Sequence, residues 1–244
     1  MLGTPAAGKG YRAHPFKEYV HRLFNQSQMD FDYTFWQMLY LCISPSKVYR
    51  QTSYHKQTKN QWARDDPAFV VILVYFLIVS VLAYAVAFHV PSVGALFKLI
   101  LAVVLRDFLS TGVLIATIFW WISNKYLRVQ GGGFSVEQDV EWLYAFDIHC
   151  NAFFPAFLVI VVLQYFFIHL MLGTGIVAVT IGNAIYSLVI VYYYYVTFLG
   201  YSALPFLSHT IYFFWYPVGV VCIAFILSIL LRISWCQLLV GMYF

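Results

Sequence analysis

Five long apolar runs limit what this chain can fold into. The first covers residues 68–88, which are 21 residues without a charge. A helix rises about 1.5 Å per residue, so this run is long enough to cross the ~30 Å hydrocarbon core of a bilayer. Four further runs cover residues 97–122, 152–170, 175–199 and 211–231. The sequence therefore predicts an all-α polytopic membrane protein with five transmembrane helices.

The composition supports this assignment. Of the 244 residues, 62% are hydrophobic and 10% are charged, whereas a soluble domain has about 25% charged residues. The formal net charge of +4 is too small to indicate a nucleic-acid partner. The four cysteines form no C-x-x-C pair, so the sequence predicts no zinc module, and we expect no cofactor.

An N-terminal region, residues 1–67, precedes the membrane domain at residues 68–244. Apolar residues recur within residues 14–28 at the spacing of an amphipathic helix. Residues 29–43 are rich in aromatic side chains but too short to cross a bilayer. They fit either an interfacial helix lying on the membrane or a helix packed against the membrane domain, and both interpretations remain open.

The distribution of basic residues predicts the orientation in the membrane. Nine of the 14 Lys and Arg residues precede residue 68, which places the N-terminus in the cytosol and, after five spans, the C-terminus in the lumen. The connections at residues 123–150 and 200–210 are then cytosolic. The basic run at residues 46–67 also suits anionic lipid. The glycosylation sequon at Asn25 stays cytosolic and unused.

Four polar side chains are predicted to lie inside the membrane. Arg106 and Asp107 fall near the middle of the second span, and because neighbouring helical residues point about 100° apart, we do not expect them to face each other. They indicate an intramembrane site with a water cavity, or a polar clamp between helices aided by Gln164 and Asn183. The clamp is the favoured interpretation.

The connection at residues 123–150 contains the densest set of reactive side chains. Asp147 and His149 resemble half of a metal or acid–base site, which Glu141 could complete. On a helix, however, Asp147 shares a face with Asn151 and not with His149. The chain has no nucleophile motif such as G-x-S-x-G. We therefore predict helix-start capping and anchoring to the second span here, no catalytic residue and no metal, with Asp147 and His149 as the weak metal candidates.

A turn after the fourth span is the other candidate site. The stretch YYYYVTFLGYSALPFL, residues 192–207, begins with four tyrosines, which favour the membrane interface, and contains no charge. We expect the helix to break at Gly200 and again at Pro205. Gly200, Tyr201, Ser202 and Pro205 are then a partner-binding or packing element.

Several strings resemble the uncoordinated-fifty family of eukaryotic Golgi membrane proteins. They occur in matching order: SPSKVYR at 44–50, KQTKNQWARDDPAF at 56–69, DVEWLYAFDIHCNAF at 139–153 and YVTFLGYSALPFL at 195–207. A shorter likeness, Gly-Tyr-Ser followed by proline after the fourth span, is to the Yip-one superfamily of vesicle-trafficking proteins. The resemblance covers roughly residues 29–210.

This resemblance implies function that composition and spacing do not. It implies a multi-span Golgi protein, in contact with Golgi membrane lipids, that supports trafficking or assembly of cell-surface receptors such as nicotinic acetylcholine receptors. It also implies a link to the Arf-exchange-factor or coat machinery. Family likeness alone adds RNA binding and a minor inner-nuclear-membrane pool, and the sequence shows no RNA-recognition motif.

Three functional hypotheses follow. The leading one is a non-enzymatic trafficking factor, whose cytosolic segments form one composite surface that recruits soluble partners while the spans contact receptor cargo. The second is a membrane-embedded enzyme or lipid handler using Asp107, Asp147 and His149, which requires Asp147 and His149 to converge on one point. The third is a proton-coupled transporter using Arg106 and Asp107, for which no inverted repeat is visible.

Overall fold

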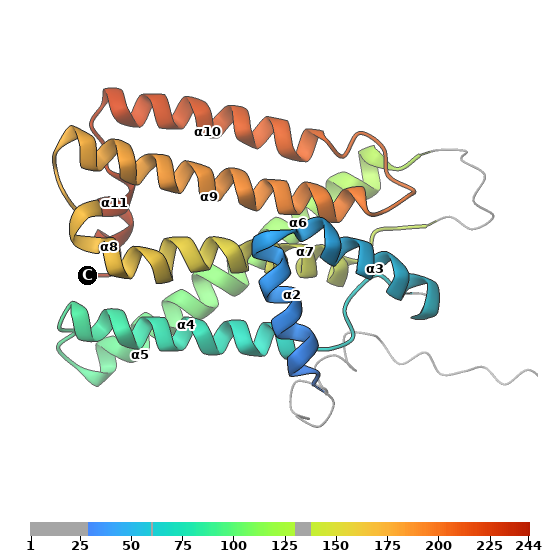
Figure 1. Ribbon diagram of the computed structural model, residues 1–244, viewed down its shortest axis with the longest axis horizontal. Coiled ribbons are helices and arrows are strands. Elements are labelled where there is room, and N and C mark those ends of the chain that lie inside the picture. Colours follow the sequence, from blue (N-terminus) through green and yellow to red (C-terminus); the bar gives the residue numbers. More distant parts are fainter. Residues whose placement is uncertain (1–28, 60, 130–137) are drawn as a thin grey trace, which may run out of the picture.

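The computed structural model describes residues 29–59, 61–129 and 138–244. The amphipathic helix expected at residues 14–28 and the sequon at Asn25 lie outside these ranges. Within them the chain is helical and contains no strand. Five helical stretches are long and apolar enough to cross a membrane, which confirms the predicted all-α fold with five spans (Figure 1).

The spans run back and forth as neighbouring helices. The first is α4 (Ala68–Ala87), the fourth is α9 (Ile176–Ser202) and the fifth is α10 (Tyr212–Leu230). The second span, residues 93–127, is continuous through four elements, namely α5 (Val93–Leu101), η2 (Ala102–Ser110), α6 (Thr111–Ile122) and η3 (Ser123–Leu127). The third span, residues 142–171, joins α7 (Trp142–Phe157), η4 (Leu158–Leu163) and α8 (Gln164–Met171). The η elements are π-helical segments, which are wider than an α-helix and often occur at functional sites.

Two predicted spans are shorter than the helices that contain them, and the predicted helix break at Gly200 is wrong. The second span was expected at 97–122 and the third at 152–170, but they extend to 93–127 and 142–171. The third helix starts early because its polar residues at 141–151 bond to other parts of the chain and so need no water. The fourth helix passes through Gly200 and ends at Ser202, since Gly200 is needed for close packing and not for a turn.

Two helices precede the spans and form a layer at one end of the bundle. In Figure 1, α2 (Phe31–Ile43) lies across the spans and α3 (Pro45–Lys59) follows it. The Asp30 side chain caps α2 by accepting a bond from the Tyr33 N–H. Pro45 opens α3 at the first helical position, where proline is tolerated because its missing N–H needs no partner. The sequence indicated only a basic run at residues 46–67 and gave no sign of α3.

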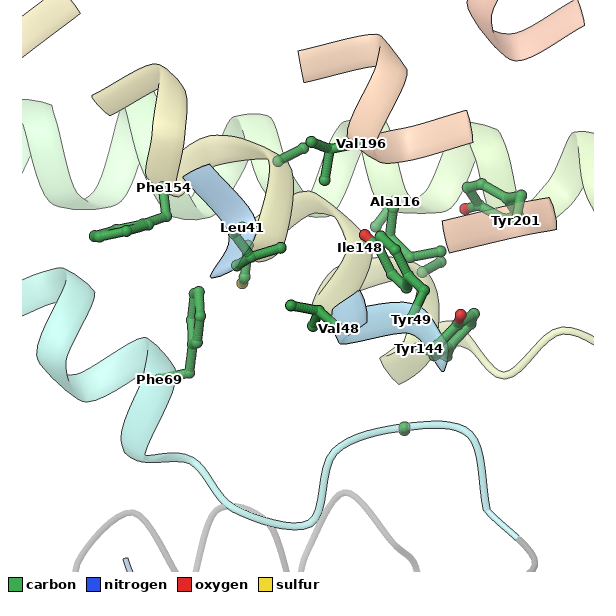
Figure 2. Close-up of a cluster of buried hydrophobic side chains, with 14 of the residues drawn as sticks. Leu41, Val48, Tyr49, Phe69, Ala116, Tyr144, Ile148, Phe154, Val196 and Tyr201 are labelled. Carbon is green, nitrogen blue, oxygen red and sulfur yellow. The ribbon is translucent and has the colours of Figure 1, made fainter. Parts of the chain in front are cut away.

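The main hydrophobic core lies beneath this layer. It joins residues from both N-terminal helices and from the spans, among them Leu41, Val48, Phe69, Ile148 and Tyr201 (Figure 2). A second, smaller cluster around Tyr84, Ile168, Tyr186 and Cys236 lies at the opposite end, where α11 (Trp235–Gly241) folds back onto the spans. The N-terminal helices are therefore packed into the membrane domain.

Candidate functional site

A carboxylate clamp holds the linker between α3 and α4 against the start of α7. Glu141 immediately precedes α7, and its side chain turns toward the linker and does not cap its own helix. Its Oε1 accepts a bond from the Trp62 N–H at 3.1 Å, and its Oε2 accepts one from the Ala63 N–H at 3.0 Å. One side chain thus satisfies two consecutive backbone donors and fixes the linker's path.

Asp147 and Asn151 extend the clamp one turn further along α7. Asp147 Oδ2 accepts a bond from the Arg64 N–H at 2.6 Å, and the Arg64 guanidinium donates to Asn151 Oδ1. The two side chains therefore share a face, as predicted. Asn151 also donates to the Tyr49 hydroxyl of α3 at 3.5 Å, and burial raises the pKa of the Tyr49 phenol above its usual range, so that it stays neutral. Asp147 lies inside the helix, so the expected capping role for it is wrong.

His149 takes part in a different set of contacts. Its Nδ1 lies 2.7 Å from the Tyr193 hydroxyl of α9, and its ring packs on Phe108 with the centroids 5.8 Å apart. The same ring covers Gly112, where a Cβ atom would come within 2.5 Å of it. His149 thus projects from the third span and contacts both the second and the fourth spans, while Asp147 binds Arg64.

The separate partners of Asp147 and His149 remove the geometry that a metal or acid–base site would need. Among the described residues, no three His, Cys, Asp or Glu side chains group closely enough to hold a metal ion. The arrangement instead connects segments: Asp147 connects α7 to the linker before α4, and His149 connects α7 to α9. The hypothesis of an enzyme built on these two residues loses the convergence that it requires.

The end of α9 is packed tightly at two of the four predicted positions. A Cβ atom on Gly200 would lie 2.7 Å from Ile148 Cγ1, so only glycine lets α9 approach α7 this closely. The Gly200 carbonyl also accepts a bond from the Tyr144 hydroxyl at 2.8 Å. Tyr201 is 1% exposed and stacks on Phe119 of the second span. Both residues are packing elements.

The other two predicted positions lie on the surface. Ser202 and Pro205 are exposed, and the Ser202 hydroxyl lies 2.9 Å from the Thr210 hydroxyl across the turn. Behind this turn, Arg128 and Leu207 form an antiparallel bridge, and the Ser208 N–H donates to the Leu127 carbonyl at 2.8 Å. The connection after the second span and the turn after the fourth are therefore joined.

The N-terminal layer is attached to the same end of the bundle. The Tyr192 hydroxyl of α9 donates to the Leu41 carbonyl near the end of α2 at 2.7 Å. On α3, four exposed residues follow a helical spacing and define what we call the α3 face: Lys47, Arg50, Gln51 and Tyr54. This basic and aromatic face lies beside the core that contains Tyr201, and no described helix covers it.

The intramembrane ion pair differs from its prediction. Arg106 Nε lies 2.7 Å from Asp107 Oδ1, so the expectation that the two neighbours would not meet is wrong, because the long arginine side chain folds back onto the carboxylate in the π-helical segment η2. Asp107 also accepts a bond from the Tyr243 hydroxyl. The Arg106 side chain is 57% exposed on the outside of the bundle.

Gln164 and Asn183 form two further polar contacts, each separate from the ion pair. Gln164 accepts a bond from the Tyr186 hydroxyl. Asn183 donates to the Ser228 hydroxyl and the Ile233 carbonyl, both at 2.8 Å, and accepts from the Trp235 N–H at 2.9 Å. Asp107, Gln164 and Asn183 therefore each connect helices or chain segments, at three separate places.

The sequence pattern did not reveal the carboxylate clamp of Glu141 and Asp147, or the contact between Asp107 and Tyr243. Glu141 and Asp147 bond to residues 78 to 83 positions away along the chain, and Tyr243 lies 136 positions from Asp107. Local spacing carries no signal for such pairs. The one available hint was that unusually polar strings, QWARDD and DVEW, flank apolar spans.

Together these features define a class: a five-span helical membrane protein in which two N-terminal helices and two inter-helix connections form one layer at one end of the bundle. The model of the UNC-50 family matches residues 19–244. The chain therefore belongs to the UNC-50 family, which confirms the resemblance found in the sequence.

Related proteins cover nearly all of this chain. It is 49% identical over 242 residues to a protein of Dictyostelium discoideum named "Protein unc-50 homolog", an alignment that covers 99% of this chain and 92% of the relative. A human protein of the same name is 45% identical over 227 residues, covering 93% and 86% of the two chains. "Protein unc-50 homolog A" of Xenopus laevis is 46% identical over 215 residues, covering 88% and 81%. No solved structure matches the chain significantly.

Proposed function

We propose that this chain is a non-enzymatic Golgi membrane protein that supports vesicular trafficking and the assembly or delivery of cell-surface receptors of the nicotinic acetylcholine type. It does so by recruiting soluble Arf-exchange-factor or coat proteins. Membership of the UNC-50 family supports this proposal through the resemblance described above. The observation that carries it is the single layer formed by segments far apart in the sequence.

The contacts within the layer make it a suitable docking platform. Glu141 fixes the linker through Trp62 and Ala63, and Tyr192 fixes α2 through the Leu41 carbonyl. A surface held in place by such bonds loses little conformational entropy when a partner binds, which favours affinity. Because two spans separate each of these segments from the next, the layer as a whole faces one compartment, which we propose is the cytosol.

The chemistry of the α3 face indicates the kind of partner. Lys47 and Arg50 supply positive charge, and Tyr54, 62% exposed, supplies an aromatic contact. Aromatic and Arg side chains are enriched at protein interfaces, and complementary charge steers the encounter. We therefore propose that the partner presents an acidic patch to the α3 face, with Ser202 and Pro205 at the edge of the contact.

Proximity labelling from the N-terminus in Golgi membranes tests the proposal. Arg50→Glu should reduce labelling of exchange-factor or coat proteins, because it reverses a charge on the proposed contact surface. Arg232→Glu is the matched control, since Arg232 is exposed at the opposite end of the bundle. Both variants should reach the Golgi in normal amounts, because neither side chain is buried.

Two results would contradict the proposed role. Equal labelling by wild type, Arg50→Glu and Arg232→Glu would show that the α3 face does not recruit these proteins. If Arg50→Glu instead lowers binding to vesicles of anionic lipid and leaves the protein labelling unchanged, the basic residues serve membrane attachment.

A further inference from the structure

A pocket of about 240 Å³ lies between the spans, away from the N-terminal layer. Its walls come mainly from α4, η2, α7 with η4, and α11, with single residues from α5, α8 and α9. They are built mostly from aliphatic and aromatic side chains such as Leu77, Val103, Phe157, Ile160 and Leu239. Pockets lined in this way bind apolar ligands or the apolar parts of larger ones.

Of the six polar side chains in the wall, all but Ser80 are already hydrogen-bonded within the described part of the protein. The Tyr84 hydroxyl donates to the Val161 carbonyl at 2.9 Å, and the Tyr186 hydroxyl donates to Gln164. The Asp107 carboxylate accepts from Tyr243 and pairs with Arg106. A ligand with several polar groups would have to break these bonds to reach any partner besides Ser80, whereas a hydrocarbon ligand needs none of them.

The wall that closes the pocket is held in place by specific bonds. The Trp235 N–H, at the start of α11, donates to Asn183 at 2.9 Å, and the Gln237 side chain donates to the Leu172 carbonyl at 2.9 Å. Beyond α11, the Phe244 ring stacks on Phe88 with the centroids 4.4 Å apart. The pocket is thus a fixed feature of the fold and not a loose gap between helices.

The position of the pocket decides which molecules can reach it. Leu77 and Tyr84 line it from α4, roughly 13 and 24 Å along that helix from Ala68. This depth lies within the ~30 Å hydrocarbon layer, where the surrounding molecules are lipid chains. Water is a poor occupant, because apolar cavities stay dry.

We propose that this pocket binds one acyl chain of a membrane phospholipid, whose headgroup stays at the membrane surface. A phospholipid is preferred to a free fatty acid, because phospholipid chains make up the hydrocarbon layer at this depth and no described Lys, Arg or His side chain lines the pocket to bind a carboxylate. The proposal assigns the family's membrane domain a bound structural or regulatory lipid, and it does not depend on the recruitment role proposed above.

Photo-crosslinking tests this assignment on the full chain in phosphatidylcholine nanodiscs. The probe is a phosphatidylcholine with a diazirine midway along one acyl chain. We expect adducts to be enriched on peptides that line the pocket, from η4 and α11. Val103→Phe fills the pocket and should remove these adducts. Val220→Phe is the matched control, because Val220 is 66% exposed on the outer face of α10, and it should leave them unchanged.

The outcomes separate the alternatives. Ala156→Leu fills the pocket from the α7 side and replaces Val103→Phe if that variant fails to fold. Equal labelling of pocket peptides in wild type and both filled variants would overturn the proposal, since the adducts would then reflect ordinary contact with the bilayer. Stronger labelling of the pocket by a fatty acid with the same diazirine chain would overturn the choice of phospholipid.

Discussion

At the level of single residues, Gly200 and Ile148 set how closely α9 approaches α7. The Ile148 side chain occupies the space where a Cβ atom on Gly200 would lie, at 2.7 Å from Cγ1 and 2.9 Å from Cδ1. Real Cβ contacts are not this short, so a larger side chain at position 200 must move Ile148 or the helix. The glycine is required by this contact and not by a turn.

Gly200→Ala should lower the free energy of unfolding by about 1–3 kcal/mol, the usual cost of overpacking a tight interface. Ile148→Ala opens a cavity and should cost about 2–5 kcal/mol. The double variant should cost less than the sum, because the new methyl group enters the space that Ile148 leaves. Thermal unfolding in detergent measures all three.

Gly219→Ala is the control for this series, since nothing lies within 4 Å of the Cβ position at Gly219 on α10. It should be neutral or stabilise slightly, because alanine has the higher helix propensity. Additive losses in the double variant would show that Gly200 and Ile148 are not coupled.

The Glu141 clamp gives a second prediction for single residues. Glu141→Gln keeps the size of the side chain but leaves one acceptor oxygen where two N–H groups now donate. Backbone exchange of the Trp62 and Ala63 amides should therefore speed up, which hydrogen–deuterium exchange with mass spectrometry measures on the peptide that contains residues 61–67.

Asp139→Asn is the matched control for the clamp. Asp139 is exposed and pairs with Arg128 at 2.6 Å, so its neutralisation should leave exchange in the 61–67 peptide unchanged. If the Trp62 and Ala63 amides of Glu141→Gln exchange as slowly as those of the wild type, the linker is held by packing and the two hydrogen bonds contribute little.

Among the elements, α2 presents two apolar faces. One face, with Met38 and Leu41, is buried against the bundle. The other consists of residues four positions apart that are 42% to 69% exposed, namely Phe31, Phe35, Leu39 and Ile43. Since α2 lies across the ends of the spans (Figure 1), this stripe is placed to enter the headgroup region of the bilayer.

A fluorescent label can test whether the stripe enters the bilayer. In a chain with Cys42→Ser and Cys222→Ser, which removes the exposed cysteines of the described residues, an environment-sensitive dye at Leu39→Cys should emit at shorter wavelength in nanodiscs and be quenched by nitroxide lipids. The same dye at Asp32→Cys should behave as in water. Aqueous emission at both positions would contradict insertion of α2.

Hydropathy predicted the number of membrane-spanning helices but not all of their ends. Runs such as residues 68–88 carry their own signal, because an apolar helix is stable in lipid without other contacts. The stretch from Glu141 to Asn151 gives no such local signal, since its polar groups bond to the linker, to α3, to α6 and to α9. Their partners lie too far away in the sequence for any local pattern to identify them.

For the whole molecule, the path of the chain determines which segments share a compartment. Residues 127 and 208 are hydrogen-bonded to each other, as are residues 62 and 141. These segments lie at the end opposite α11, which bonds to the turn near Leu172. Five spans place the two ends of the described chain on opposite sides of the membrane, so a single measurement of sidedness orients every segment.

The charge distribution predicts that the N-terminal layer is cytosolic, because nine of the 14 basic residues precede the first span. A glycosylation acceptor joined by a flexible linker after Phe244 should therefore be glycosylated in cells, while the same tag placed before Met1 should not. Electrophoretic mobility with and without glycosidase reads out both. The native sequon at Asn25 serves as an internal control and should stay unmodified. Glycosylation of the N-terminal tag would show that the orientation is the opposite one. The α3 face would then lie in the lumen, out of reach of cytosolic partners.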